Sequence, residues 1–253
     1  MKQDVLGLHI SSHESCETIV DTFIQLIREG GCKIVTYVNP YAYFIAERST
    51  NYRTLLSQFD TILSDGIAVV LAARLLDISG ITRISPDSTS LMPHLFRTCV
   101  AEGVPVFLIG GNSGVAERAA GILRESFPGL HFARTLPGYF QDQDETIRMI
   151  KESGAKLVVC GMGMPAQEAF MLALKKSEWS GLAVACGGYL DQLSGGLQYY
   201  PKWIDRLNLR FLYRLAREPH RLWRRYILEY RVFLLRLIKQ LLKHRLGVVS
   251  KRP

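Results

Sequence analysis

The chain has 253 residues, of which 48% are hydrophobic and 21% charged, so it can bury a sizeable core and is not an intrinsically disordered protein. Its formal net charge of +8 is unevenly distributed, because residues 1–201 carry a net charge of −4 and residues 202–253 a net charge of +12. A basic segment that follows an acidic body predicts an anionic partner, which a nucleic acid, a membrane surface or a polyanionic substrate would each provide.

The cysteine, histidine and N-terminal patterns exclude several further classes of protein. The five cysteines lie far apart and form no CxxC pair, so we expect free thiols in a reducing cytoplasm. The six histidines are scattered, so we expect neither a metal site nor a bound cofactor. Acidic residues precede any apolar run at the N-terminus, and no run of 18 uncharged apolar residues occurs. Neither a signal peptide nor a membrane-spanning helix is therefore expected.

Residues 1–201 alternate short β-branched runs with segments of helical periodicity, which is typical of βαβ units around a mostly parallel sheet. Strands are predicted at 33–38, 60–63, 104–109, 130–136, 157–160 and 182–185. Helices are predicted at 13–29, 40–49, 66–76, 88–102, 113–126, 143–153 and 165–177, with Ser113 as a cap and Pro165 in a first turn. The fold is therefore expected to be α/β, with a Rossmann-like sheet flanked by helices.

From residue 202 the sequence places leucines and aromatic residues at nearly helical spacing, with arginines between them. Pro219 is expected to divide this stretch into a shorter and a longer helix. Four charged residues interrupt its most apolar part, so a helix lying in the plane of a membrane interface fits better than a spanning helix. Residues 202–253 are interpreted as a basic amphipathic appendage whose apolar residues, Phe233 and Leu237 among them, enter lipid. A pair of oligomerisation helices is the alternative.

Ligands of open α/β sheets bind outside the carboxyl ends of the strands, so the residues just after each predicted strand are candidates for a site. Thr36 and Asn39 could contact a sugar, although Asn39 could equally shape the turn into the next helix. Asp65 follows a buried strand and precedes a glycine, and its carboxylate could accept a proton from an attacking hydroxyl. Asp65 could instead cap the helix that begins beside it.

Glycine turns follow the strands predicted at 104–109 and 157–160, and each turn leads into a helix. The free N–H groups and the helix dipole at such a turn suit a diphosphate, although a plain tight turn explains the first of them as well. The dinucleotide fingerprint and the P-loop lysine are both missing. The candidates at these turns and after the last strand are Gly110, Gly111, Asn112, Gly161, Gly163, Gln167, Glu168 and Asp191.

The order of these junctions is similar to that of the WecG/TagA/CpsF glycosyltransferases of bacterial surface-polymer synthesis. The resemblance covers nearly the whole chain and is carried by TYVNPYAY, SDGIAVVLA, VPVFLIGGNSGVAERAAGILRESFPGL with PGYF, VVCGMGMPAQE, and GGYLDQLSGG with FLYRLAREPHRLWRRY. It implies an inverting hexosyltransferase, without an essential metal, that moves a sugar from a UDP-sugar to an undecaprenyl-diphosphate-linked sugar. Residues 1–201 would be the nucleotide-sugar-binding catalytic domain.

The resemblance also implies where the protein works and with what partners. Residues 202–253 would hold it on the anionic, cytoplasmic face of the bacterial inner membrane as a peripheral protein, with a homo-oligomer as a further possibility. A basic α/β protein that binds nucleic acid is the alternative function, since Tyr213, Trp223 and Tyr226 could stack on bases. The density of Leu, Phe and Ile among the arginines suits lipid better, so no nucleic-acid partner is expected.

Carried over position by position, the resemblance implies a role for several side chains. It assigns the base to Asp65, the polar pocket to Asn39, Arg83 and the second catalytic residue Gln167, and the acceptor's diphosphate to Arg214, Arg221 and Arg224. The sequence departs from the family pattern at Tyr37, where Thr is usual, at Ala166, where Lys is usual, and after Arg83. These departures affect the sugar pocket, so the transferred sugar is left open among N-acetylmannosamine, glucose and a uronic acid.

Overall fold

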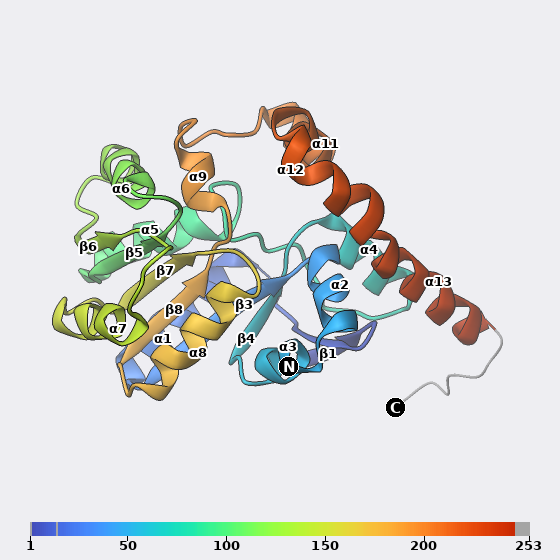
Figure 1. The fold of residues 1–253 in the computed structure, drawn as a ribbon, viewed down its shortest axis with the longest axis horizontal. Coiled ribbons are helices and arrows are strands. Elements are labelled where there is room, and N and C mark those ends of the chain that lie inside the picture. Colours follow the sequence, from blue (N-terminus) through green and yellow to red (C-terminus); the bar gives the residue numbers. More distant parts are fainter. Residues whose placement is uncertain (1, 14, 246–253) are drawn as a thin grey trace.

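The computed structural model of the chain describes residues 2–13 and 15–245, apart from the side chains of Lys202, Arg221 and Arg245. Its centre is a six-stranded parallel sheet in the order β4-β3-β8-β7-β5-β6 (Figure 1). The strands are β3 (Cys32–Val38), β4 (Thr61–Ser64), β5 (Val106–Gly110), β6 (Phe132–Leu136), β7 (Leu157–Gly161) and β8 (Gly181–Ala185). The predicted α/β fold and all six predicted strands are confirmed. The strands are continuous apolar runs because helices bury them on both faces of the sheet.

Helices cover the two faces of the sheet in separate groups (Figure 1). One face carries α1 (Cys16–Glu29), α5 (Leu91–Glu102) and α6 (Val115–Ser126), and the other carries α2 (Pro40–Arg48), α3 (Thr50–Ser57), α7 (Gln143–Glu152) and α8 (Ala166–Lys176). Helix α4 (Ile67–Leu75) follows β4, and the short α9 (Tyr189–Leu193) follows β8. The chain leaves the neighbouring strands β5 and β7 toward opposite faces, which makes their carboxyl ends the switch point where such sheets bind ligands.

An antiparallel hairpin precedes the sheet and was not predicted. Strand β1 (Lys2–Val5) turns at Leu6 and Gly7 into β2 (Leu8–Ser11), and both turn residues have positive φ, 54° and 85°. A two-residue turn of this type favours Asn-Gly or Asp-Gly, so the Leu-Gly pair gave no hairpin signal in the sequence. The hairpin contacts β4, and buried Val5 and Ile10 extend the core beyond that edge of the sheet.

Residues 202–245, which we call the tail, form a chain of helices that runs back over the body (Figure 1). They are α10 (Lys202–Arg206), α11 (Arg210–Arg217), α12 (Pro219–Arg224), the π-helical turn η1 (Arg225–Glu229) and α13 (Arg231–Arg245). The predicted break at Pro219 is confirmed, because α11 ends before it. The prediction that Phe233 and Leu237 enter lipid is wrong: they are 6% and 9% exposed in the core, and the Phe233 ring lies 5.0 Å from that of Tyr43 on α2.

Candidate active site

Two adjoining cavities lie at the carboxyl ends of the strands. The first, about 490 Å³, is lined by the end of β3, by the segment that follows β4 and by the tail, and it contains Asp65; we call it the carboxylate cavity. The second, about 450 Å³, lies against the turns after β5, β7 and β8; we call it the glycine cavity. They share the lining residues Gly163, Gly187, Gly188 and Gln192. A ligand that occupies one cavity would therefore reach the wall of the other.

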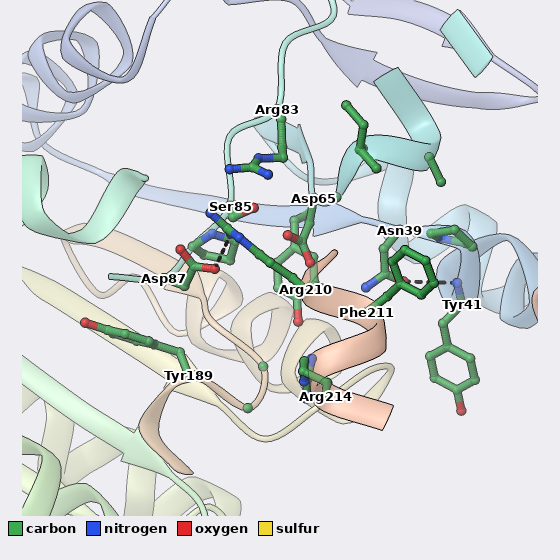
Figure 2. Close-up of a pocket in the computed structure, with 18 of the residues that line it drawn as sticks. Asn39, Tyr41, Asp65, Arg83, Ser85, Asp87, Tyr189, Arg210, Phe211 and Arg214 are labelled. Carbon is green, nitrogen blue, oxygen red and sulfur yellow. Dashed lines mark hydrogen bonds and ion pairs between the residues drawn. The ribbon is translucent and has the colours of Figure 1, made fainter. Parts of the chain in front are cut away.

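Asp65 stands in the carboxylate cavity directly after β4 (Figure 2). Its backbone N–H donates to the carbonyl of Val38 at 2.9 Å, which fixes the end of β4 against β3. Helix α4 is capped by Gly66, at φ 84°, and has no side-chain cap, so the alternative interpretation of Asp65 as a helix cap is wrong. The carboxylate instead faces the cavity, where a substrate hydroxyl could reach it.

The surroundings of Asp65 favour its protonated form. Burial raises the pKa of this carboxyl above its ordinary value, and the negative charge of Asp87 raises it further. Ser85, Arg210 and Arg214 act in the opposite direction and lower it. A carboxylate with a raised pKa is a stronger base, which suits the removal of a proton from a sugar hydroxyl.

Of the two candidates at the end of β3, one lines the cavity and the other lies in the core. Asn39 lines the carboxylate cavity and also caps α2, where its Oδ1 accepts from the N–H groups of Tyr41 at 3.0 Å and Ala42 at 3.3 Å (Figure 2). Both interpretations of Asn39 are therefore compatible with its position. Thr36 is 1% exposed and lies outside both cavities, so it is not placed to contact a sugar. Tyr37 lines the carboxylate cavity instead.

Gln167 is fully buried beneath the cavities and does not line either of them. Its Nε2 donates to Oε1 of Glu168 at 2.8 Å, and its Oε1 accepts the N–H of Gly187 at 3.1 Å. Thr36 donates its hydroxyl to the same Glu168 oxygen at 2.8 Å. This network holds the turn after β8, so Gln167 is placed to shape the wall that the cavities share rather than to contact a substrate. Burial raises the pKa of Glu168 to about 7.

The glycine turns after β5 and β7 pack directly against each other. A Cβ on Gly110 would lie 2.4 Å from the carbonyl oxygen of Gly161, so no larger residue fits there. Gly111 donates its N–H to that same oxygen at 3.1 Å. Gly110 does not line the glycine cavity, whereas the predicted residues Gly111, Asn112, Gly161, Gly163 and Asp191 do.

Two predicted helix starts differ in detail. The cap of α6 is Gly114, in the left-handed conformation at φ 80°, so the prediction of Ser113 as the cap is wrong. Pro165 occupies the cap position of α8, one residue before the first turn that we predicted for it. Residues of both turns line the glycine cavity.

Arginines of the tail meet Asp65 across the carboxylate cavity. Arg210 and Arg214 line it (Figure 2), as does Arg225. The buried Nε of Arg214 has no hydrogen-bond partner among the described residues. Arg225 lies over the ring of Tyr41 at 4.0 Å. Arg224 is exposed and lines neither cavity, and the side chain of Arg221 lies outside the described residues. Sequence reasoning missed Arg210 and Arg225, because helical periodicity does not reveal which arginines of a docked tail turn inward.

Among the described residues, no group of three or more His, Cys, Asp and Glu side chains is arranged to hold a metal ion. Asp142 and Asp144 form an Asp-x-Asp pair, a pattern that can bind a metal ion. Asp142 instead caps α7, where its Oδ1 accepts the N–H of Glu145 at 3.0 Å. No helix in residues 2–13 and 15–245 is both long and apolar enough to cross a bilayer.

Residues 3–247 match the model of the glycosyl transferase WecG/TagA/CpsF family. The chain is 30% identical over 209 residues to a UDP-Gal:alpha-D-GlcNAc-diphosphoundecaprenol beta-1,4-galactosyltransferase of Shigella boydii, which covers 82% of this chain and 86% of that protein. It is 32% identical to an N-acetylglucosaminyldiphosphoundecaprenol N-acetyl-beta-D-mannosaminyltransferase of Bacillus spizizenii, over 77% of this chain and 74% of that protein. The Bacillus subtilis protein of the same name is 29% identical, over 76% of this chain and 74% of that protein.

Proposed function

Because this chain belongs to the WecG/TagA/CpsF family of glycosyltransferases, we propose that it transfers a hexose or N-acetylhexosamine from a UDP-sugar to an undecaprenyl-diphosphate-linked sugar, with inversion. The observation that carries the proposal is the position of Asp65, which shares one cavity with arginines of the tail. The relatives described above are all transferases of this kind, so the nucleic-acid alternative is set aside.

The chemistry is a single displacement. A hydroxyl of the acceptor sugar attacks the anomeric carbon of the donor, while Asp65 takes the hydroxyl proton. The new C–O bond forms as the bond between the anomeric carbon and the diphosphate breaks, and UDP leaves with the electron pair. One displacement inverts the anomeric configuration, in keeping with the beta linkages that the relatives' names carry.

We assign the UDP of the donor to the glycine cavity. That cavity lies at the switch point of the sheet, and its glycine turns let a diphosphate approach the backbone near the start of α6. Its shared wall with the carboxylate cavity would bring the donor's anomeric carbon toward Asp65. The charge of the leaving UDP would then be stabilised by the protein, and we expect activity in the presence of a chelator.

We assign the acceptor's diphosphate to Arg214 and Arg225, which line the carboxylate cavity. Arg214 is half-buried, and its buried Nε has no hydrogen-bond partner among the described residues, so its guanidinium is suited to charge-assisted hydrogen bonds with phosphate oxygens. In this arrangement residues 1–201 bind the donor and residues 202–253 complete the site for the acceptor.

The tail also supplies the surface that we assign to the membrane. Eleven of the fourteen exposed large apolar side chains of the described residues lie in residues 203–242, and a concentration of this kind marks an interaction surface. They alternate with arginines and lysines in a segment of net charge +12. We infer peripheral binding to the anionic, cytoplasmic face of the membrane, with self-association through the same apolar residues as the competing outcome.

A donor panel tests the proposed function. The purified full-length protein is incubated with N-acetylglucosaminyl-diphosphoundecaprenol in detergent and, separately, with UDP-galactose, UDP-N-acetylmannosamine, UDP-glucose and UDP-glucuronic acid. Mass spectrometry of the lipid fraction should find the acceptor extended by one sugar residue with one of these donors, with and without chelator. Free sugar as the only product, or no product from any donor, would contradict the proposal.

A further inference from the structure

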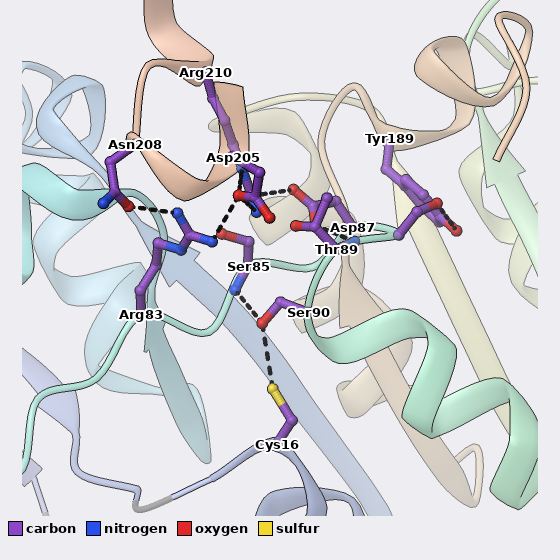
Figure 3. Close-up of polar contacts among 11 residues, drawn as sticks. Cys16, Arg83, Ser85, Asp87, Thr89, Ser90, Tyr189, Asp205, Asn208 and Arg210 are labelled. Atoms are coloured by element: carbon purple, nitrogen blue, oxygen red, sulfur yellow. Dashed lines mark hydrogen bonds and ion pairs between the residues drawn. The ribbon is translucent and has the colours of Figure 1, made fainter. Parts of the chain in front are cut away.

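We propose that Arg83 and Asp87 of the body and Asp205, Asn208 and Arg210 of the tail form a latch that positions α11, and with it Arg214, over Asp65 (Figure 3). The latch gives Arg83 a positioning role for the acceptor site in place of the sugar contact that the family resemblance implies. This inference rests on the proposed function, because it concerns how the acceptor arginine is held.

The latch joins body and tail through hydrogen bonds between residues 122 to 125 positions apart, and one further bond within the tail links them. Arg83 donates from Nη1 to Oδ1 of Asn208 at 2.8 Å and from Nη2 to Oδ1 of Asp205 at 3.0 Å. Arg210 donates from Nε to the same Asp205 oxygen at 2.6 Å and from Nη1 to Oδ2 of Asp87 at 3.0 Å. Two guanidinium groups and two carboxylates therefore alternate across the boundary between body and tail.

The burial of these groups makes the latch stronger than ordinary surface ion pairs. The side chains of Arg210 and Asp87 are 13% and 15% exposed, and those of Arg83 and Asp205 are 20% and 30% exposed. Partly buried charges are screened less than exposed ones, and removal of one partner leaves the other charge unpaired. Because each guanidinium already faces carboxylates, neither Arg83 nor Arg210 presents an unpaired charge to a phosphate.

Each half of the latch is held in place by its own segment. Oδ1 of Asp87 accepts the N–H of Thr89 at 2.9 Å, which directs the other oxygen toward Arg210. Asn208 has φ 57°, a left-handed conformation that Asn tolerates better than most residues, and this turn aims its amide at Arg83. The turn between α10 and α11 is thereby fixed against the body.

Helix α11 is held by the latch and by ring contacts. None of its residues is buried, and Phe211 and Leu212 are 45% and 47% exposed. The ring of Tyr213 lies 5.8 Å from those of Tyr199 and Tyr200, which supports the middle of the helix, while the latch fixes its first turn. Arg210 and Arg214 are one helical turn apart on the same side of α11. An ion pair at Arg210 therefore sets the rotation of the helix and directs Arg214 toward Asp65.

The test compares isosteric and conservative variants of the full-length protein. Asp205→Asn removes the shared anion without a change in size, Arg83→Met removes the body's side of the latch, and Arg83→Lys keeps one ion pair. Arg206→Met, an exposed arginine of α10 beside the latch, is the matched control. We expect the KM for lipid-linked acceptor to rise about 10- to 100-fold in Asp205→Asn and Arg83→Met. The increase should be smaller in Arg83→Lys, with the Kd for UDP unchanged in every variant.

Hydrogen exchange of the α11 amides gives a second readout that needs no activity. Exchange should accelerate in Asp205→Asn and Arg83→Met but not in Arg206→Met, even if the wild-type protein transferred no sugar. Unchanged exchange in α11 would overturn the latch. A Kd for the UDP-sugar that rises in Arg83→Met but not in Asp205→Asn would also overturn it, because Arg83 would then contact the donor directly.

Discussion

Asp65 is the side chain on which the proposed reaction depends most. Asp65→Asn keeps the size of the group but cannot accept a proton, so turnover should fall by about 10² to 10⁴ while the Kd for UDP stays nearly constant. Because the pKa of Asp65 is raised, the wild-type kcat/KM should fall on acidification at a higher pH than an ordinary aspartate would give. Steady-state kinetics as a function of pH measure both effects, and near-normal turnover of Asp65→Asn would remove it from the chemistry.

Glu168 predicts a pH dependence of stability. Its pKa is about 7 in the fold and near the ordinary 4.5 in the unfolded chain, because burial penalises its charge. Between these values the folded protein holds one more proton, so this group lowers the free energy of unfolding by about 3 kcal/mol as the pH rises from 4.5 to 7. Above pH 7 the loss is constant.

Glu168→Gln carries no charge at any pH and should remove this dependence. Urea unfolding at pH 5 and pH 8 should show that the variant gains about 2 to 3 kcal/mol relative to the wild type between the two conditions. Glu125→Gln, on the exposed side of α6, is the control and should leave the profile unchanged. Parallel pH profiles of the wild type and Glu168→Gln would show that Glu168 ionises normally.

At the scale of elements, α13 is part of the core as well as part of the tail. Phe233→Ala removes a ring that packs against Tyr43 and should cost about 3 to 5 kcal/mol of unfolding free energy. Leu235→Ala, on the same helix but 60% exposed, should change it by less than about 0.5 kcal/mol. Chemical denaturation distinguishes the two, and equal small effects would mean that α13 does not dock on α2 in solution.

The sheet could be predicted from the sequence because buried parallel strands are continuous runs of Val, Ile and Leu. The location of Asp65 in the candidate site could be predicted because polar residues that follow such strands meet at one edge of the sheet. Prediction failed where position depends on tertiary contacts. Thr36 precedes the end of β3 by two residues and is covered by α8, and Gln167 turns inward to Gly187. No local pattern distinguishes the inward Arg214 from the outward Arg224, because the docking of the tail decides that.

For the whole molecule, the apolar and basic faces of the tail predict binding to anionic vesicles. The residues Leu234, Ile238 and Leu242 lie on one side of α13 and are 45% to 55% exposed, so each adds about 1 kcal/mol when its exposed half leaves water. Replacement of all three by Ser should weaken flotation with phosphatidylglycerol vesicles about 100-fold or more, and salt should weaken binding of the wild type. Equal binding to neutral vesicles, or a dimer that buries these residues in sedimentation experiments, would contradict the assignment.

The central claim is that the two substrates are held by different parts of the chain and meet at Asp65. The most direct test measures the KM for lipid-linked acceptor and the Kd for UDP in Arg214→Ala, with the exposed Arg224→Ala as the matched control. We predict an acceptor KM about 10- to 100-fold higher in Arg214→Ala, unchanged in Arg224→Ala, and a UDP Kd that is the same in both variants and the wild type. Weakened UDP binding with an unchanged acceptor KM in Arg214→Ala would contradict the account.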